Sequence, residues 1–191
     1  KLLMPMSEER STLRQSLIPH LVEAASYNVA RSIDSVALYE IGSVFLGQTA
    51  EELPFEEEHL ALVLTGKWID NTWQGEKKNV DFFVAKGILE AVFAKLGLDT
   101  RVSYVKAIID GMHPGRTAEI LLDGEKVGLI GQLHPTEQKK AGVKETYVAE
   151  LNLMAILNAT NEALIYTSVP RFPMMTRDIA LELDSATPAG D

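Results

Sequence analysis

Apolar residues recur at helical spacing in three stretches of the chain. The first covers Ser16–Arg31, where apolar positions three and four residues apart form one stripe. The second follows Asp81, whose side chain can cap a helix, and continues to Leu96. The third is Pro135–Ala141, because proline suits the first turn of a helix. These stretches are predicted helices, and a further short helix is expected through Leu157.

Strands are predicted where apolar and polar residues alternate or where short apolar runs occur. The clearest pair flanks Asp123-Gly124, a dipeptide that readily takes the positive φ angles of a tight turn, and so predicts an antiparallel hairpin. A rigid turn at His113-Pro114 is expected to lead into this hairpin, and His134-Pro135 is expected to lead out of it. The predicted strands are Val36–Leu46, His59–Thr65, Arg101–Val105, Thr117–Leu122, Lys126–Leu133, Tyr147–Leu153, Leu164–Ser168 and Asp178–Asp184.

Loops and boundaries complete the predicted organisation. The acidic segment Glu51–Glu58, which contains Pro54, and the segment Lys67–Asn79, which holds both tryptophans, are predicted to be loops. Because hairpins replace a regular alternation of strand and helix, the predicted fold class is α+β with an antiparallel sheet. Residues 1–168 are expected to form one core module. Residues 169–191 are expected to be a proline-containing linker and the first strand of a second domain.

Composition narrows the classes of function. The chain has 191 residues, of which 46% are hydrophobic, enough for one substantial core. Its formal net charge of −9 argues against holding a phosphate backbone by bulk electrostatics. The sequence has no cysteine, which excludes disulfides and thiolate metal sites, and no apolar run approaches the roughly 20 residues of a membrane helix. We therefore expect a soluble, cytoplasmic protein.

Few motifs in the sequence carry chemistry. A Gly-x-Ser-x-Gly elbow, a Walker loop and a Gly-x-Gly-x-x-Gly motif are all missing from it. His113 and His134 could meet at the open end of the hairpin, but zinc needs three or four ligands, and none surrounds this pair at the usual spacings. Turn and capping roles explain both histidines more simply. Acidic runs are expected to be solvated surface, and aromatic residues to be core or partner-contact surface rather than a ligand platform.

Several segments, taken in order, resemble one known family. They are the lead-in Met4–Pro19, the strand Leu38–Phe45, the helix start Val80–Gly87, the hairpin ends His113–Arg116 and Gly131–Pro135, and the terminal segment Arg171–Leu183. The first five resemble the bacterial phenylalanyl-tRNA synthetase beta subunit. The terminal segment resembles the entry to that subunit's ferredoxin-like anticodon-binding domain.

The resemblance implies a class II aminoacyl-tRNA synthetase-like fold, an antiparallel sheet flanked by helices, that has the architecture without the activity. It implies a place in the ligase that charges tRNA with phenylalanine, in which the whole enzyme uses ATP and magnesium. The implied partner is the catalytic alpha subunit in an (αβ)₂ assembly, with tRNA bound through the rest of the enzyme. Candidate subunit-interface residues are Tyr27 and Arg31 on the first predicted helix and Phe82 and Phe83 on the second.

The sequence also indicates whether this piece has the residues of a class II active site. Class II active sites hold ATP with an Arg-x-Glu pair on a strand and a Gly-x-Gly-x-x-x-Arg element. The nearest approach here is Arg116 and Glu119, whose side chains would point to opposite sides of a regular strand, and the second element is missing from the sequence. We therefore predict no catalytic, cofactor-binding or metal-binding residue in this piece. The alternatives are an active adenylate-forming class II-like ligase and a free-standing tRNA-binding module, which the negative charge opposes.

Overall fold

The structure is a computed structural model that describes residues 4, 5, 7, 8, 11–47, 53–160, 166, 168, 169 and 171–184. Its elements, in chain order, are α1 (Ile18–Val29), β1 (Val36–Leu46), β2 (Phe55–Thr65), β3 (Lys67–Asn71), β4 (Glu76–Asn79), α2 (Phe82–Lys95), β5 (Val102–Lys106), β6 (Met112–Leu122), β7 (Glu125–Leu133), α3 (Pro135–Ala141), β8 (Thr146–Asn152) and α4 (Leu153–Ala159).

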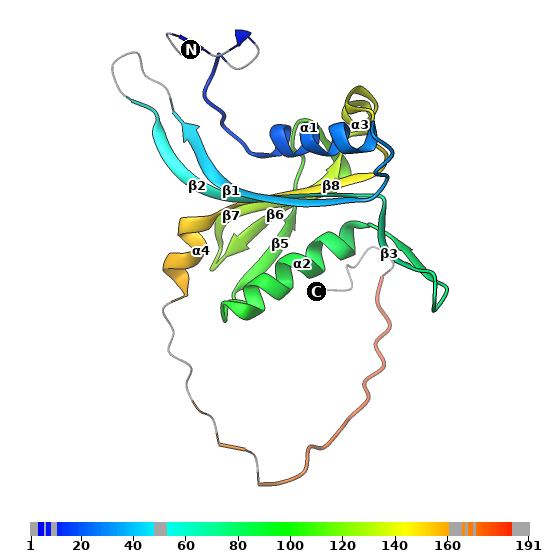
Figure 1. The fold of residues 1–191 in the computed structure, drawn as a ribbon. Coiled ribbons are helices and arrows are strands. Elements are labelled where there is room, and N and C mark those ends of the chain that lie inside the picture. Colours follow the sequence, from blue (N-terminus) through cyan, green and yellow to red (C-terminus); the bar gives the residue numbers. More distant parts are fainter. Residues whose placement is uncertain are drawn as a thin grey trace.

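One antiparallel sheet organises the described part of the chain. Its strands lie in the order β1-β2-β8-β7-β6-β5, and each neighbouring pair is antiparallel. Helices α1 and α3 lie on one face of this sheet, and α2 and α4 lie on the other (Figure 1). Strands β3 and β4 form a separate hairpin beside the start of α2 (Figure 1). The predicted α+β class, with an antiparallel sheet flanked by helices, is confirmed.

The central strand β2 is apolar on both of its faces because the sheet is covered on both sides. Leu62 and Leu64 pack in the core beneath α2, whereas Ala61 and Val63 pack beneath α1. All four side chains are buried. Strand alternation therefore divides a single apolar run between two cores.

Local signals set the ends of the helices and the turn of the hairpin. The Asp81 side chain accepts a hydrogen bond from the Val84 amide at 2.7 Å and caps α2, and Gly142 ends α3 in the left-handed conformation. Asp123 and Gly124 have φ angles of 52° and 86°, as the predicted tight turn requires. Within the described residues, no helix has both the length and the apolar character needed to cross a membrane.

Two predicted loops are wrong in part, because long-range pairing makes strands of them. The end of Glu51–Glu58 belongs to β2, whose residues from Phe55 onward pair with β1. The segment Lys67–Asn79 forms β3 and β4, joined by a turn in which the Asn71 side-chain oxygen accepts hydrogen bonds from two backbone amides. Neither β3 nor β4 shows a strong apolar alternation, so hydrogen bonding to the neighbouring strand outweighs the local sequence pattern here.

Two further predictions concern the hairpin entry and the end of the chain. Strand β6 already starts at Met112, which pairs with Leu133, and the His113-Pro114 turn is an irregularity within it. The strand predicted at Asp178–Asp184 is not formed, because these residues have no strand to pair with in the described chain. Most of the strand predicted at Leu164–Ser168 lies outside the described residues. The division at residues 168 and 169 stays a prediction.

Candidate functional site

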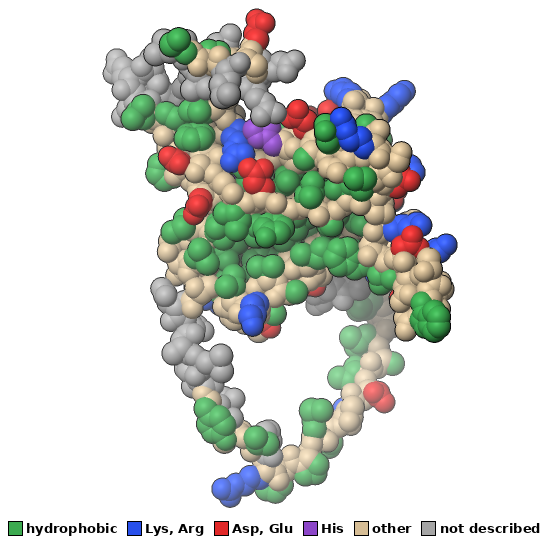
Figure 2. Space-filling view, viewed as in Figure 1, with side chains coloured by type: hydrophobic (Ala, Val, Ile, Leu, Met, Phe, Trp, Pro, Cys, Tyr) green, Lys and Arg blue, Asp and Glu red, His purple; other side chains and the backbone are tan. Residues whose placement is uncertain are grey.

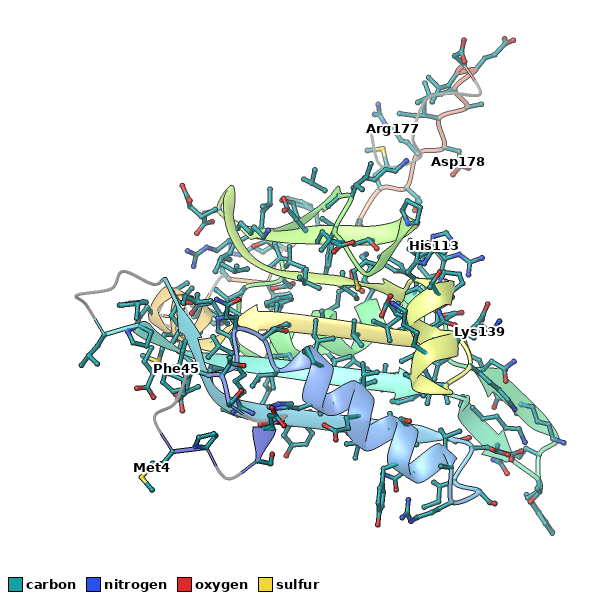
Figure 3. The ribbon with its side chains drawn as sticks, turned by 90° about the horizontal axis from the view of Figure 1, so that it is seen from above. Met4, Phe45, His113, Lys139, Arg177 and Asp178 are labelled. Carbon is teal, nitrogen blue, oxygen red and sulfur yellow. The ribbon has the colours of Figure 1, made fainter. Side chains whose placement is uncertain are left out.

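A hollow of about 780 Å³ lies above the sheet between α1 and α3. Its floor comes from Leu129 and Leu133 of β7 and from Met112, and α1 and α3 form its two sides (Figure 3). The remaining residues around it come from the turn before β6. The full lining is Ser16, Ile18, Pro19, Val22, Glu23, Ser26, Ile109, Asp110, Gly111, Met112, Leu129, Leu133, Glu137, Lys140 and Ala141.

The charged side chains around this hollow are mostly acidic. Among the described residues, they are the carboxylates of Glu23, Asp110 and Glu137 and the ammonium group of Lys140. The Lys140 Nζ atom lies 2.7 Å from Glu137 Oε1, so its charge is already matched. Proteins hold nucleotide phosphates with arginine, lysine or backbone amides directed at the phosphate oxygens. This lining therefore disfavours a nucleoside triphosphate.

Arg116 and Glu119 engage different partners on opposite faces of the sheet. The Arg116 guanidinium donates to Gln132 Oε1 at 2.8 Å and lies 3.7 Å from Glu145. Glu119 instead binds Lys126 Nζ at 2.6 Å, and in the sheet it pairs with Leu129, which faces α1. The predicted divergence of the two side chains is therefore observed.

A buried glutamate connects the start of α1 to the middle of the sheet. Glu150, on β8, accepts hydrogen bonds from Ser16 Oγ at 2.5 Å and from the Leu17 amide at 3.0 Å. Its Oε1 atom also lies 2.8 Å from His59 Nδ1, and His59 Nε2 lies 3.1 Å from Glu57. Both imidazole nitrogens thus face carboxylate oxygens.

Sequence reasoning missed this network, although the chain contains a signal for it. Glu150 is the one acidic residue in the apolar run Tyr147–Leu151, and a carboxylate in a strand buried on both faces needs hydrogen-bond donors. The donors come from residues far away in the sequence, near positions 16 and 59, so spacing alone could not identify them. The network fixes α1 on the sheet rather than presenting a reactive group to the hollow.

Arg14 forms a second link between the lead-in and the sheet. Its guanidinium donates to the Ser43 carbonyl at 2.8 Å and to Glu40 at 2.6 Å. A Cβ atom added at Gly42 would lie 2.4 Å from Arg14 Nη2, so glycine makes room for this side chain. Gly42 therefore serves this close approach and does not mark a β-bulge, because the β1–β2 register runs without a shift.

The two hairpin histidines have local roles in turns. His113 Nδ1 accepts from the Gly115 amide at 3.1 Å, and His134 Nδ1 accepts from the Thr136 amide at 3.2 Å at the start of α3. Within the described ranges, no group of three or more His, Cys, Asp or Glu side chains is placed to hold a metal ion. The turn and capping roles therefore account for both residues.

The four candidate interface residues fall on two separate surfaces. Tyr27 is exposed on α1, with Arg31 Cζ 3.3 Å from the centre of its ring. Phe83 is 75% exposed on α2, while its neighbour Phe82 is half-buried and packs against the core. Because α1 and α2 lie on opposite faces of the sheet, the four residues cannot form one continuous patch (Figure 1). A single partner surface would contact one pair or the other.

An apolar surface also lies at the β1 edge of the sheet. Tyr39 and Ile41 of β1 are exposed there, and Tyr39 lines an apolar hollow of about 390 Å³ that β1 and β2 form with α2. Figure 2 shows hydrophobic side chains gathered in this region, between the sheet and α2. Of the two roles expected for the aromatic residues, core or partner-contact surface, the core role does not apply to Tyr39, Phe83 and Trp73, the last of which is 94% exposed.

Tyr104 is the one buried side-chain polar group among the described residues that lacks a hydrogen-bond partner. Burial and the nearby Glu90 carboxylate raise its pKa to about 12. It lies on the α2 side of the sheet, where Lys86 Nζ is 4.7 Å from the centre of its ring. It therefore belongs to neither the hollow beside α1 nor the Glu150 network.

Comparison with known proteins identifies the family. Residues 1–153 match the family described as the phenylalanyl tRNA synthetase beta chain CLM domain. The chain belongs to this family. A phenylalanine–tRNA ligase beta subunit from Geobacillus kaustophilus (strain HTA426) is 57% identical over 190 residues, and one from Bacillus subtilis (strain 168) is 51% identical over 189. These matches cover 100% and 99% of this chain but 24% of each relative, so it spans about a quarter of their length.

The fold of this synthetase family member also resembles solved structures. Pyrrolysyl-tRNA synthetase from Desulfitobacterium hafniense superimposes with a TM-score of 0.54 and 15% sequence identity, over 76% of this chain and 49% of that one. At this identity the likeness concerns the fold alone. The class II-like synthetase fold implied by the sequence is confirmed.

Proposed function

We propose that this chain is a non-catalytic structural module of the phenylalanine–tRNA ligase beta subunit, which packs against the catalytic alpha subunit. The whole cytoplasmic enzyme, an (αβ)₂ assembly, would use ATP and magnesium to charge tRNA with phenylalanine. The observation that carries the non-catalytic role is the lining of the hollow above the sheet. Its charged groups are three carboxylates and a lysine already paired with one of them.

The neighbouring geometry supports the same proposal. An ATP site of the class II type needs an arginine and a glutamate that converge on one nucleotide. Arg116 and Glu119 instead bind Gln132 and Lys126, on opposite faces of the sheet. The polar side chains near the start of α1 are used in holding that helix on the sheet through Glu150.

Isothermal titration tests the non-catalytic role. We expect no heat of binding when ATP and phenylalanine are added to this chain, because the lining of the hollow offers carboxylates to an anionic nucleotide. The assembled enzyme is the positive control. Saturable heat from this chain that an Arg116→Ala variant abolished would support an active adenylate-forming ligase instead.

Charge substitutions test the packing role. In the complete beta subunit, we expect Tyr27→Glu combined with Arg31→Glu to weaken association with the alpha subunit at least about tenfold, because the pair is an exposed aromatic–cation contact of the kind found in binding hot spots. Phe83→Glu tests the opposite face, and Lys106→Glu, on the edge strand β5, is the control. Association is measured by sedimentation of the mixed subunits. Unchanged association in both test variants would contradict packing through these surfaces.

A further inference from the structure

We propose that the hollow between α1 and α3 is a docking groove for a cationic amphipathic helix of a partner protein or domain. Neither Tyr27 nor Arg31 is among the residues that line this groove. The proposal therefore does not depend on which surface contacts the alpha subunit. It rests on the apolar floor, the charge of the rim and the fixed geometry of the walls.

The groove offers a partner a continuous apolar surface. Ile18 and Val22 are half-buried on its α1 side, one helical turn apart, and Leu129 is half-buried on its floor. Along α1 the lining extends from Ile18 to Ser26, about 12 Å at the rise of an α-helix. That length matches about two turns of a docked helix, whose side chains three and four residues apart would fill the hollow.

The rim favours a positively charged occupant. Three carboxylates and one ammonium group give the lining a formal charge of −2. Asp110 is exposed and has no ion-pair partner among the described residues. Lysine or arginine side chains flanking an apolar stripe would complement these carboxylates, whereas an acidic segment or a nucleic-acid backbone would be repelled.

The walls of the groove are held in place before any partner binds. Ser26 Oγ donates to the Ala141 carbonyl at 2.5 Å and so joins α1 to α3. On the other side, the His134 amide donates to the Gly111 carbonyl at 2.9 Å, and Gly111 has a φ of 75° that suits glycine. A preformed groove lowers the ordering cost of binding.

Site-specific photo-crosslinking in the assembled enzyme tests the proposal. A benzoylphenylalanine replaces Val22 in the complete beta subunit, and a second version replaces Lys95, exposed at the end of α2 on the opposite face. We expect the Val22 probe, but not the Lys95 probe, to capture a peptide with net positive charge and apolar residues at helical spacing. Capture of an acidic peptide, capture of RNA, or the absence of any captured polypeptide would overturn the proposal.

A double charge-reversal variant tests the proposal that the occupant of the groove is cationic. We expect Glu23→Lys with Asp110→Lys to reduce the crosslinking yield from Val22 at least fivefold. The matched control is Glu125→Lys with Asp99→Lys, which makes the same charge change at exposed positions away from the groove. Sedimentation with the alpha subunit is measured in parallel, so that loss of assembly is distinguished from loss of groove contact. Equal yields in the two variants would refute a cationic occupant.

Discussion

Replacing Phe93 with alanine is expected to lower the free energy of unfolding of this chain by about 3–5 kcal/mol, the usual cost of removing a fully buried phenylalanine. Phe93 is 1% exposed and lies in the core between α2 and the sheet. Its removal would leave a cavity lined by apolar side chains that cannot collapse fully, because sheet and helix are both fixed by hydrogen bonds. Chemical unfolding followed by circular dichroism measures the change.

Phe83→Ala, on the same helix, is the matched control for this prediction. Phe83 is 75% exposed, and its ring meets Phe82 edge-on at 5.9 Å between centroids. The loss of this contact is expected to cost no more than about 1 kcal/mol. A similar loss of stability in the two variants would show that α2 is not anchored on the sheet through Phe93.

Glu150→Ala is expected to destabilise the chain by about 3–4 kcal/mol, because it removes a buried carboxylate whose partners then lack an acceptor. Those partners are Ser16 Oγ, the buried Leu17 amide and His59 Nδ1. The same change loosens the start of α1, so hydrogen exchange of amides in the first turn of α1 should increase. Glu150→Gln, which keeps an acceptor oxygen but loses the charge, is expected to cost less than the alanine variant.

Glu145→Ala provides the comparison just before the same strand. Its side chain is 64% exposed and reaches Arg116 only at 3.7 Å, so the expected cost is below about 1 kcal/mol. Urea unfolding of Glu150→Ala and Glu145→Ala side by side separates a buried network from a surface ion pair. Equal costs would contradict the role assigned to Glu150.

Local chemistry made much of the fold predictable. The helix over Pro135–Ala141 and the strand over Val36–Leu46 have the predicted bounds, and the turn at Asp123-Gly124 forms where expected. Each depends on interactions within a few residues: a proline in the first turn, an alternating pattern, or a dipeptide that accepts positive φ. These preferences act without reference to the rest of the chain.

Pairing between strands was much less predictable than these local features. The arms of the β3–β4 hairpin are polar, and their strand character comes from their ladder of hydrogen bonds rather than from an apolar pattern. The opposite error occurred at Asp178–Asp184, where alternation predicts a strand but no described strand lies alongside to pair with it. Strand formation needs a partner, and a sequence pattern does not supply one.

The sequence by itself determined the fold class, the family and the separation of Arg116 from Glu119. These follow from the spacing of apolar residues, the order of the motifs and the alternation of side chains along a strand, all of which can be read without knowing the fold. Only the tertiary structure decided where the charges meet. It buried Glu150 against residues more than 130 positions away, placed Tyr27 and Phe83 on opposite faces, and assembled the groove from α1, α3 and the turn before β6. The physical reason is that folding the sheet brings distant segments together, and the environment of a side chain is set by those neighbours.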